Sequence, residues 1–479
     1  MPDKIRHDDL RVFDLPINMV LGSVALKNDL FMFLDVLQLF SLFQLHLERY
    51  RVNSCDLKTT DHDHMPMLQK SNSRNTMIAQ SNGSQNKRNR NGFFSKVSIV
   101  VSSRIVLNTA RRFAYPFAPA LSRGLDVPLS AVTAAIGVNQ ATGILGMIFG
   151  PISDRLGYRL MMLVGMSMLV IGMFAAGLLP MYATVLVALF LAGLAKNIFD
   201  AALQAYVGEQ VPFAKRGMVI GLLELAWAGS TLIGIPVMGV VIDRLGWHAP
   251  FLVLGGTGVL GLIGIAIVIP ADTPSADRKK QPGFWDLWRI LAGSRPALGA
   301  LGFAFFFSMA NDALFVVYGA WLETAFGLSI LAIGASTSVI GAAELTGEII
   351  TVSLADRFGL KRLILLGACL TALGNALLPL FGASLALALC GLFLVYICFE
   401  FTFVTCLSLS TELVPGARAT MMSGLFATAG IGRFIGAWGG GYIWTAGGIS
   451  ATAATAATAS VAAVIMLIWG LRGWEPNKS

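Results

Sequence analysis

The chain has 479 residues, of which 55% are hydrophobic and only 13% are charged, and its mean hydropathy is +0.70. Soluble domains carry about 25% charged residues, so this composition excludes an ordinary soluble protein and indicates several membrane-spanning helices. The net charge of +8 does not indicate nucleic-acid binding, because the basic residues lie in short segments between apolar runs and not in one stripe or arm.

Residues 1–95 differ in composition from everything that follows. The stretch 29–47 is apolar but contains polar residues at loosely helical spacing, which predicts a helix at the membrane interface. Residues 51–96 are rich in Asn, Ser and Lys, a composition typical of a disordered tail. Three methionines within this extension offer later translation starts: Met65, Met67 and Met77.

From residue 96 onward, twelve apolar segments are long enough to cross a membrane. We expect six at 97–121, 128–150, 160–180, 183–207, 217–240 and 249–270, and six more at 297–321, 328–350, 362–381, 384–409, 418–442 and 450–470. The sequence therefore predicts an all-α polytopic membrane protein with two six-helix bundles. Its predicted parts are an extension (1–95), a first bundle (96–270), a linker (271–296), a second bundle (297–472) and a tail (473–479).

Lysine and arginine residues gather in alternate connections between these spans. They precede the first span, fill the linker, and follow spans 2, 4, 8, 10 and 12. Cytoplasmic loops of membrane proteins carry such an excess of positive charge. We therefore expect both ends of the twelve-helix core in the cytoplasm. The bacterial inner membrane is the default location, and an intracellular membrane is the alternative.

Two loops in equivalent places of the two halves share a short motif. "GPISDRLGYR" (150–159) follows the second span, and "VSLADRFGLK" (352–361) follows the eighth. Such duplication is expected where a substrate site lies between two halves that rock against one another. A glycine lets a helix end pack closely, and an aspartate can bind loop arginines and a neighbouring helix end. The loops are therefore predicted to act as a conformational latch.

Both loops resemble the signature loop of the major facilitator superfamily of transporters. The matching residues are Gly150, Asp154, Arg155, Gly157 and Arg159 in the first copy and Asp356, Arg357, Gly359 and Lys361 in the second, which has Val352 in place of the opening glycine. The resemblance covers residues 97–470 and implies two pseudo-symmetric bundles that work by alternating access. The fifth span is also similar to that of the superfamily's proton antiporters, although Ile235 separates its glycine from its proline.

Charged residues inside the predicted spans are the candidates for function. A charge at the bilayer centre costs about 2.5–3.5 kcal/mol or more, so it should face protein or water. Spans 3, 6, 9 and 12 hold no charge and are expected to face lipid. The superfamily's first, fourth, seventh and tenth helices line its central cavity. The predicted cavity-lining residues are Arg111, Arg112, Lys196, Asp200, Asn311, Asp312 and Glu400.

A proton relay must use carboxylates, because all five histidines lie outside the predicted spans. Glu344 and Glu348 share one helix face, and two such carboxylates cannot easily both ionise in a low-dielectric setting. The proton-site candidates are Asp312, Glu344, Glu348 and Glu400. Structural alternatives stay open: Lys196 could neutralise Asp200, and Arg433 could pair with Glu400.

The first span holds two adjacent arginines near mid-membrane, about ten residues from its outer end. Arg111 and Arg112 point about 100° apart, so one is expected to face the cavity while the other binds a neighbouring carboxylate. Arg112 is the predicted substrate contact, slightly ahead of Arg111. Pro116 and Pro119 are expected to bend the outer part of this helix and to contribute to gating.

These features predict a secondary active transporter that exports a small solute by proton antiport. No G-x-x-x-x-G-K-[ST] sequence is present, so ATP hydrolysis within the chain is not expected. No catalytic, metal-ligand or cofactor motif indicates an enzyme. The alternatives are uptake of a small organic anion by proton symport or exchange, and a transport-inactive scaffold or sensor. The expected partners are the solute, protons and membrane lipid, without nucleic acid, and the protein is expected to be a monomer.

Overall fold

The computed structural model describes residues 96–146, 149, 152–153, 156–210, 223–270, 289, 291–414 and 418–474. The predicted extension with its interfacial helix, most of the linker and most of the tail lie outside these residues. Every regular element within the described residues is a helix, so the predicted all-α class is confirmed.

The first half starts with a helix over 96–112, which is interrupted at 113–117 and continues as α3 (Ala118–Leu125). The interruption contains Pro116, which has no backbone N–H and obstructs the preceding helical turn. The following helices are α4 (Leu129–Ala141) with its continuation η1 (Thr142–Leu145), α6 (Tyr158–Leu178), α7 (Tyr182–Gln210), the span Leu223–Leu245 and α10 (Ala249–Val268). The span Leu223–Leu245 contains a π-helical turn, η2 (Ser230–Gly234), before it ends as α9 (Ile235–Leu245).

The second half repeats this pattern. Its helices are α12 (Arg295–Phe315), α13 (Tyr318–Phe326), α14 (Ile330–Phe358), α15 (Leu360–Leu377) with η3 (Leu378–Ala383), α16 (Leu385–Leu413) and α17 (Arg418–Gly470). The break between α12 and α13 is equivalent to the break in the first helix. α17 is two helices in series, because the backbone at Gly447 and Gly448 is not helical.

These segments account for twelve membrane spans within the described part of the chain. Nine stretches are long and apolar enough to cross a membrane, and the last of them, Thr420–Gly470, contains two helices. The other two spans are the shorter apolar helix Leu129–Leu145 and the first helix with α3. The predicted number of spans is therefore confirmed, with ends that differ from the expected ones by a few residues.

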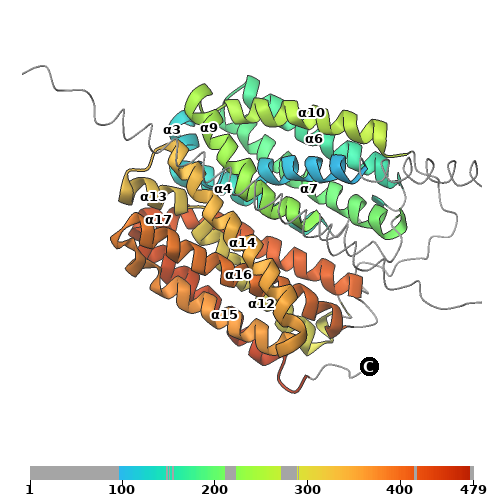
Figure 1. Cartoon of the computed structure of the whole chain (residues 1–479), viewed down its shortest axis with the longest axis vertical. Helices are drawn as coiled ribbons and strands as arrows, with labels where there is room; N and C mark the ends of the chain where they lie inside the picture. The colour runs from blue at the N-terminus through green and yellow to red at the C-terminus, as the bar shows by residue number, and fades with distance from the viewer. Residues whose placement is uncertain are drawn as a thin grey trace, which may run out of the picture. The chain divides into compact units, whose positions relative to one another are not determined.

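In Figure 1 the helices of the first half, coloured blue to yellow-green, form one bundle, and those of the second half, coloured yellow to red, form another beside it. α4 packs against α17, and α9 packs against α14. Glycines permit this close approach: a Cβ on Gly239 of α9 would lie 3.1 Å from the Cα of Gly334 in α14. Small residues at helix crossings are typical of membrane proteins.

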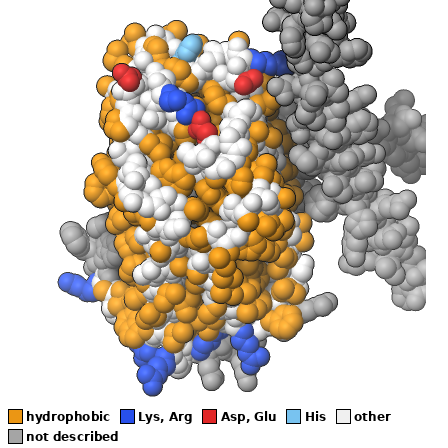
Figure 2. Space-filling model, turned by 90° about the vertical axis from the view of Figure 1, so that its left-hand side faces the viewer, with side chains coloured by type: hydrophobic (Ala, Val, Ile, Leu, Met, Phe, Trp, Pro, Cys, Tyr) orange, Lys and Arg blue, Asp and Glu red, His pale blue; other side chains and the backbone are white. Residues whose placement is uncertain are grey.

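The outer surface of the described bundle is broadly apolar. Figure 2 shows hydrophobic side chains across a wide band of the visible face, with lysine and arginine side chains protruding below it. Spans 3, 6, 9 and 12 each expose large hydrophobic side chains, among them Ile171, Ile267, Leu370 and Ile468. Other spans also expose such side chains, for example at Val187 and Leu394, so the expectation that these four spans face lipid stays a prediction.

The ends of the bundle differ in charge. The basic end, where the helix over 96–112 begins, carries Lys96, Arg159, Arg295, Lys361 and Arg362. At the opposite end the two halves are in close contact. Arg123 of α3 forms an ion pair with Glu323 of α13 at 2.8 Å, and a Cβ on Gly319 would collide with the carbonyl oxygen of Pro116. The opposite end is therefore closed in this conformation.

One carboxylate near the basic end of the described bundle is open to solvent. The side chain of Glu224 is 53% exposed, although it forms an ion pair with Arg104 of the first helix. An exposed carboxylate inside a membrane bundle requires water nearby. The conformation is therefore closed at the opposite end and hydrated toward the basic end.

Candidate functional site

A small cavity lies between the two halves of the described bundle. Its volume is about 20 Å³, which admits a water molecule but not an organic solute. The first half lines it with Arg111, Arg112, Tyr115, Gln140 and Trp227, and the second half with Asn311, Asp312, Phe315, Glu344, Phe399, Glu400 and Arg433. Of the residues predicted to line a cavity, only Lys196 and Asp200 lie outside this one.

Arg112 connects the two halves. Its Nη2 and Nη1 atoms donate to Oε1 and Oε2 of Glu344 in α14 at 2.5 and 3.3 Å, and Nη1 also donates to the Thr231 hydroxyl at 2.5 Å. Both ion-pair side chains are buried, and the guanidinium lies 4.2 Å from the centre of the Trp227 ring. A bidentate, buried pair of this kind is strong because each charge satisfies the other.

The π-helical turn η2 positions the Thr231 hydroxyl for this contact. Thr231 lies within η2, which also faces the first helix at Gly234, where a Cβ would collide with the Thr109 side chain. π-helical turns occur frequently at functional sites because they shift side chains relative to a regular α-helix. The fifth span thus crosses the first helix closely enough for Thr231 to reach Arg112.

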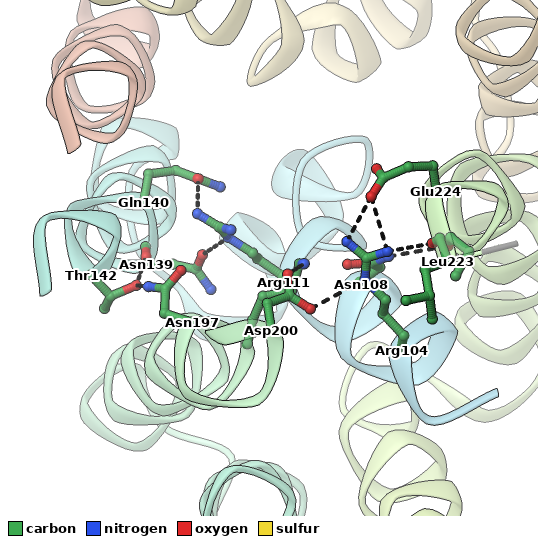
Figure 3. Close-up of polar contacts among 12 residues, drawn as sticks. Arg104, Asn108, Arg111, Asn139, Gln140, Thr142, Asn197, Asp200, Leu223 and Glu224 are labelled. Atoms are coloured by element: carbon green, nitrogen blue, oxygen red, sulfur yellow. Dashed lines mark hydrogen bonds and ion pairs between the residues drawn. The ribbon is translucent and has the colours of Figure 1, made fainter. Parts of the chain in front are cut away.

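Arg111 has quite different partners. Its Nε donates to Oδ1 of Asn139 at 3.2 Å, and its Nη2 donates to Oε1 of Gln140 at 2.5 Å (Figure 3). The residue is only 8% exposed, and among the described residues no carboxylate forms an ion pair with it. One of the two arginines is bound to a carboxylate, as predicted, but both line the cavity. However, Arg112, the slightly favoured substrate contact, is the arginine bound to the carboxylate.

Asp312 of α12 is held from three sides. Its Oδ1 accepts a hydrogen bond from the Tyr115 hydroxyl at 2.6 Å, and its Oδ2 accepts one from Asn311 at 3.3 Å. Arg433 of α17 lies 3.8 Å from the same Oδ2. The suggested pairing of Arg433 with Glu400 is therefore wrong, because the side chain of Arg433 reaches Asp312 and lies over the rings of Trp227 and Phe403.

Glu400 of α16 has no hydrogen bond or ion pair with any described residue, although it is only 7% exposed. The charged groups that act on it are Glu344, Glu348, Arg112 and Arg433. A buried carboxylate without a partner is costly in its charged form, so such a group is suited to hold a proton or to bind a ligand. Glu344 and Glu348, predicted as a pair, differ: Glu344 binds Arg112, whereas Glu348 is half-buried and has no such partner in the described residues.

A second charge network surrounds Arg104, which lies about two helical turns from Arg111 on the same helix; its contacts are drawn in Figure 3. Arg104 of the first helix contacts Asp200 at 3.2 Å, Glu224 at 3.3 Å and the carbonyl oxygen of Leu223 at 2.5 Å. Lys196 forms an ion pair with Asp200 on the same helix. Of the two alternatives for Lys196 and Asp200, the geometry shows the neutralising pair.

The sequence did not single out the aromatic residues of the cavity. Trp227 lies within 6 Å of three cations, with Arg112 at 4.2 Å and Lys196 and Arg433 at 5.8 Å from its ring centre. Phe and Trp residues are spread over most spans, so composition alone does not mark the few that face inward. The one available signal is that Trp227 lies three residues, close to one helical turn, beyond Glu224.

The motif loops are only partly described. Gly150, Asp154 and Arg155 lie outside the described residues, as do the side chains of Asp356 and Arg357. Gly157 and Gly359 precede α6 and α15 with φ of 98° and 78°, which L side chains rarely adopt. Around Gly359 the space is open, so this glycine serves the backbone conformation and not close packing.

Arg159 and Lys361 occupy equivalent positions in the two halves and have equivalent partners. Arg159 donates to the carbonyl oxygen of Ala266 at 2.5 Å, and Lys361 donates to those of Leu471 and Trp474 at 2.8 and 3.1 Å. Each basic side chain thus binds the C-terminal end of the last helix of its own half, where carbonyl groups lack helical partners.

A family model decides the identity of this fold. The model of the Major Facilitator Superfamily matches residues 100–319 and 301–479, one match for each half. The chain belongs to the Major Facilitator Superfamily. It is therefore an integral multi-pass membrane protein, and members of this superfamily move small solutes by secondary transport.

Curated relatives include known and unassigned transporters. The MFS-type transporter YceJ of Bacillus subtilis is 27% identical over 281 residues, which are 58% of this chain and 71% of that protein. The chloramphenicol resistance protein CraA of Acinetobacter baumannii is 23% identical over 242 residues, covering 49% and 56%. A multi-drug resistance efflux pump PmrA homolog of Lactococcus lactis is 22% identical over 264 residues, covering 53% and 65%.

Solved transporters share the fold. A bacterial homolog of the human lysosomal transporter Spinster, in an inward-facing conformation, has a TM-score of 0.62 at 14% identity and covers 79% of this chain and 95% of its own. A D-xylose–proton symporter has a TM-score of 0.63 at 16% identity and covers 79% and 98%. At these identities the likeness concerns the fold alone, and it agrees with the two-bundle architecture predicted from the sequence.

Proposed function

We propose that this superfamily member exports small organic solutes in exchange for protons, with the central cavity as its transport site. The relatives named for chloramphenicol resistance and multi-drug efflux support export as the direction. The observation that supports proton coupling is Glu400, a carboxylate buried in the cavity without a hydrogen-bond or ion-pair partner among the described residues. Buried carboxylates that load and unload protons are the means of coupling in a chain without histidine in its spans.

Alternating access would work on the contacts that join the halves at the cavity. The Arg112–Glu344 pair joins the first helix to α14, and the Tyr115–Asp312 hydrogen bond joins it to α12. Any motion that separates the halves at the opposite end must break or rearrange both contacts. Glu344 and Asp312 would then need another partner or a proton, which makes them further proton-site candidates beside Glu400 and Glu348.

The proposed organisation follows the charge pattern. We place the bundles at 96–270 and 297–472, the basic end in the cytoplasm and the protein, as a monomer, in a bacterial inner membrane. The bacterial relatives and the positive charge of the basic end support this placement. In this orientation the closed end faces outward. The loops around Asp154 and Asp356 are proposed to latch the cytoplasmic end in the alternate conformation.

A second candidate, uptake of a small organic anion by proton symport or exchange, is favoured by Arg111. Its buried guanidinium has amide partners only, so its charge is not neutralised by a carboxylate within the described residues. Protonation of Glu400 would make the cavity more positive and so promote anion binding. An anion would therefore travel with the proton, whereas a cationic group that competes for Glu400 would travel against it.

Proteoliposomes with an imposed pH gradient test the proposal. A panel of cationic, neutral and anionic solutes should include at least one that accumulates when the interior is acidic, as antiport requires. Glu400→Gln should abolish gradient-driven accumulation while solute exchange at equal pH persists, and the exposed control Asp243→Asn should behave as the parent chain. Accumulation only with an acidic exterior would support the anion symport candidate. Proton-coupled export would be refuted if no solute accumulated under either gradient. It would also be refuted if Glu400→Gln accumulated solute as the parent chain does.

A further inference from the structure

The charges of the cavity do not all neutralise one another. Arg112 pairs with Glu344, and Arg433 lies at ion-pair distance from Asp312. Among the described residues, two charges that line the cavity remain without an ion pair: Arg111 on the first half and Glu400 on the second half. They have opposite signs, both are more than nine-tenths buried, and both line the cavity.

Arg111 keeps donors for a ligand. Its Nε and Nη2 atoms bind the side-chain oxygens of Asn139 and Gln140, while Nη1 has no hydrogen bond to a described residue. Those amides are themselves fixed, because Asn139 donates to the Leu189 carbonyl oxygen and Gln140 donates to the Tyr115 hydroxyl, each at 2.6 Å. The guanidinium is thus held in place by neutral groups, with its charge available to an anion.

Aromatic residues line the cavity together with these two charges. Tyr115 and Phe315 have ring centres 4.7 Å apart, and Trp227 and Phe399 also line the cavity. Such walls favour a flat apolar body, because aromatic rings gain from offset and edge contacts in addition to burial. A matching solute therefore combines an aromatic body with polar groups at two sites.

We infer that the solutes of this transporter include small aromatic zwitterions, whose acidic group binds Arg111 and whose ammonium group binds Glu400. This inference rests on the proposed function, since it takes the cavity as the transport site. A simple anion would leave Glu400 without a partner, and a simple cation would leave Arg111 without one. Leaving a buried charge unpaired weakens binding, so the cavity selects for a solute that carries both charges.

Binding of the solute's ammonium group to Glu400 would also produce antiport. A proton on Glu400 must leave before an ammonium group binds there, so solute and proton exclude one another. The charged groups that face Glu400 are Glu344 and Glu348 from α14, Arg112 from the first helix and Arg433 from α17. Because the cavity is too small for an organic solute in this conformation, binding requires the halves to move apart at the basic end.

Three probes with one phenyl skeleton test the inference: L-phenylalanine, 3-phenylpropionate and phenethylamine. Binding of each to the purified full chain in detergent is measured by calorimetry, and proton release by a pH dye in weak buffer. We expect phenylalanine to bind about tenfold or more tightly than either other probe. Phenylalanine and phenethylamine should release protons, and phenylpropionate should not.

Substitutions at Arg111 and Glu400 test which group of the solute each residue binds. Arg111→Gln should weaken phenylalanine binding about tenfold and leave phenethylamine binding unchanged, while Arg111→Lys should restore part of the preference. Glu400→Gln should remove proton release and the preference for phenylalanine over phenylpropionate. Asp243→Asn is the control for both. Equal affinity for the three probes, binding of none, or an equal loss for all three in Arg111→Gln would overturn the inference.

The binding measurement separates this inference from the proposed function, because it needs no gradient and no transport. Gradient-driven export of other solutes without selective binding of phenylalanine would refute the solute class alone. Selective binding of phenylalanine without gradient-driven transport of any solute would refute proton-coupled export alone.

Discussion

Two neighbouring arginines on the first helix show how strongly position on a helix decides the role of a residue. Arg112 faces the second half and is bound by the Glu344 carboxylate, whereas Arg111 faces α4 and is bound by two amides. Consecutive residues of an α-helix differ by about 100° in direction, so the two side chains reach different partners although both line the cavity. One arginine therefore joins the halves, and the other keeps its charge for the cavity.

Replacing Glu344 with Gln should destabilise the protein, because it leaves the buried Arg112 charge without a counter-charge. Breaking a buried ion pair costs about 3–5 kcal/mol. The midpoint of thermal unfolding in detergent measures this loss. Glu348→Gln is the matched control on the same helix and should cost little, since Glu348 has no ion pair within the described residues.

The double variant Arg112→Met with Glu344→Leu should recover most of the stability, because removing both charges also removes the cost of burying them. Equal unfolding midpoints for Glu344→Gln and Glu348→Gln would show that the Arg112 pair does not stabilise the fold.

At the scale of secondary-structure elements, each half contains a helix that is broken at an equivalent place. The first helix is interrupted before α3, and α12 is interrupted before α13, so each half has a separate short helix at the opposite end. These short segments meet where Gly319 lies against the carbonyl oxygen of Pro116. The contact permits closure because glycine has no side chain to separate the two backbones.

Gly319→Ala should therefore shift the protein toward conformations that are open at the opposite end. A Cβ at this position would collide with backbone, which has no alternative rotamer. The measurement is the distance between spin labels placed on α3 and α13, and we expect a larger population of long distances.

Gly299→Ala is the control for a steric clash that does not involve the contact between the two halves. A Cβ on Gly299 of α12 would also collide with backbone, 2.4 Å from the Cα of Gly470, but both of these residues belong to the second half. This substitution should lower stability without changing the distance between α3 and α13. A distance distribution in Gly319→Ala that matches the parent chain would argue against the Pro116–Gly319 contact as part of the gate.

At the scale of the whole molecule, the distribution of charge is expected to set the orientation of the protein in its membrane. The basic end is expected in the cytoplasm. A membrane-impermeant maleimide added to intact cells should label Met181→Cys, in the exposed connection between α6 and α7, but not Arg362→Cys at the basic end. Both variants are made with the native cysteines replaced by alanine, and cell lysis should make Arg362→Cys reactive. The reverse pattern would invert the proposed topology.

Much of the fold follows from the sequence because lipid imposes a simple rule. A span needs about 20 apolar residues, and loop charge sets its direction, so the twelve helices and the two-half repeat are visible in one dimension. The residues of the motif loops also indicated the family of the protein. The structural role of their residues was not visible: Gly359 is needed for a backbone conformation, and Lys361 binds carbonyl groups at Leu471 and Trp474, more than a hundred residues away.

The sequence by itself determined which charges lie inside the membrane, and that Glu344, Asp312 and Glu400 had to face protein or water. Only the tertiary structure decided which of them neutralise each other. Arg112 meets Glu344, and Arg433 meets Asp312 and not Glu400, across separations of more than a hundred residues. The helical repeat relates side chains on one helix, but the rotation of one helix relative to another is set only by packing. That packing left Arg111 and Glu400, which line the cavity from different halves, without an ion pair among the described residues.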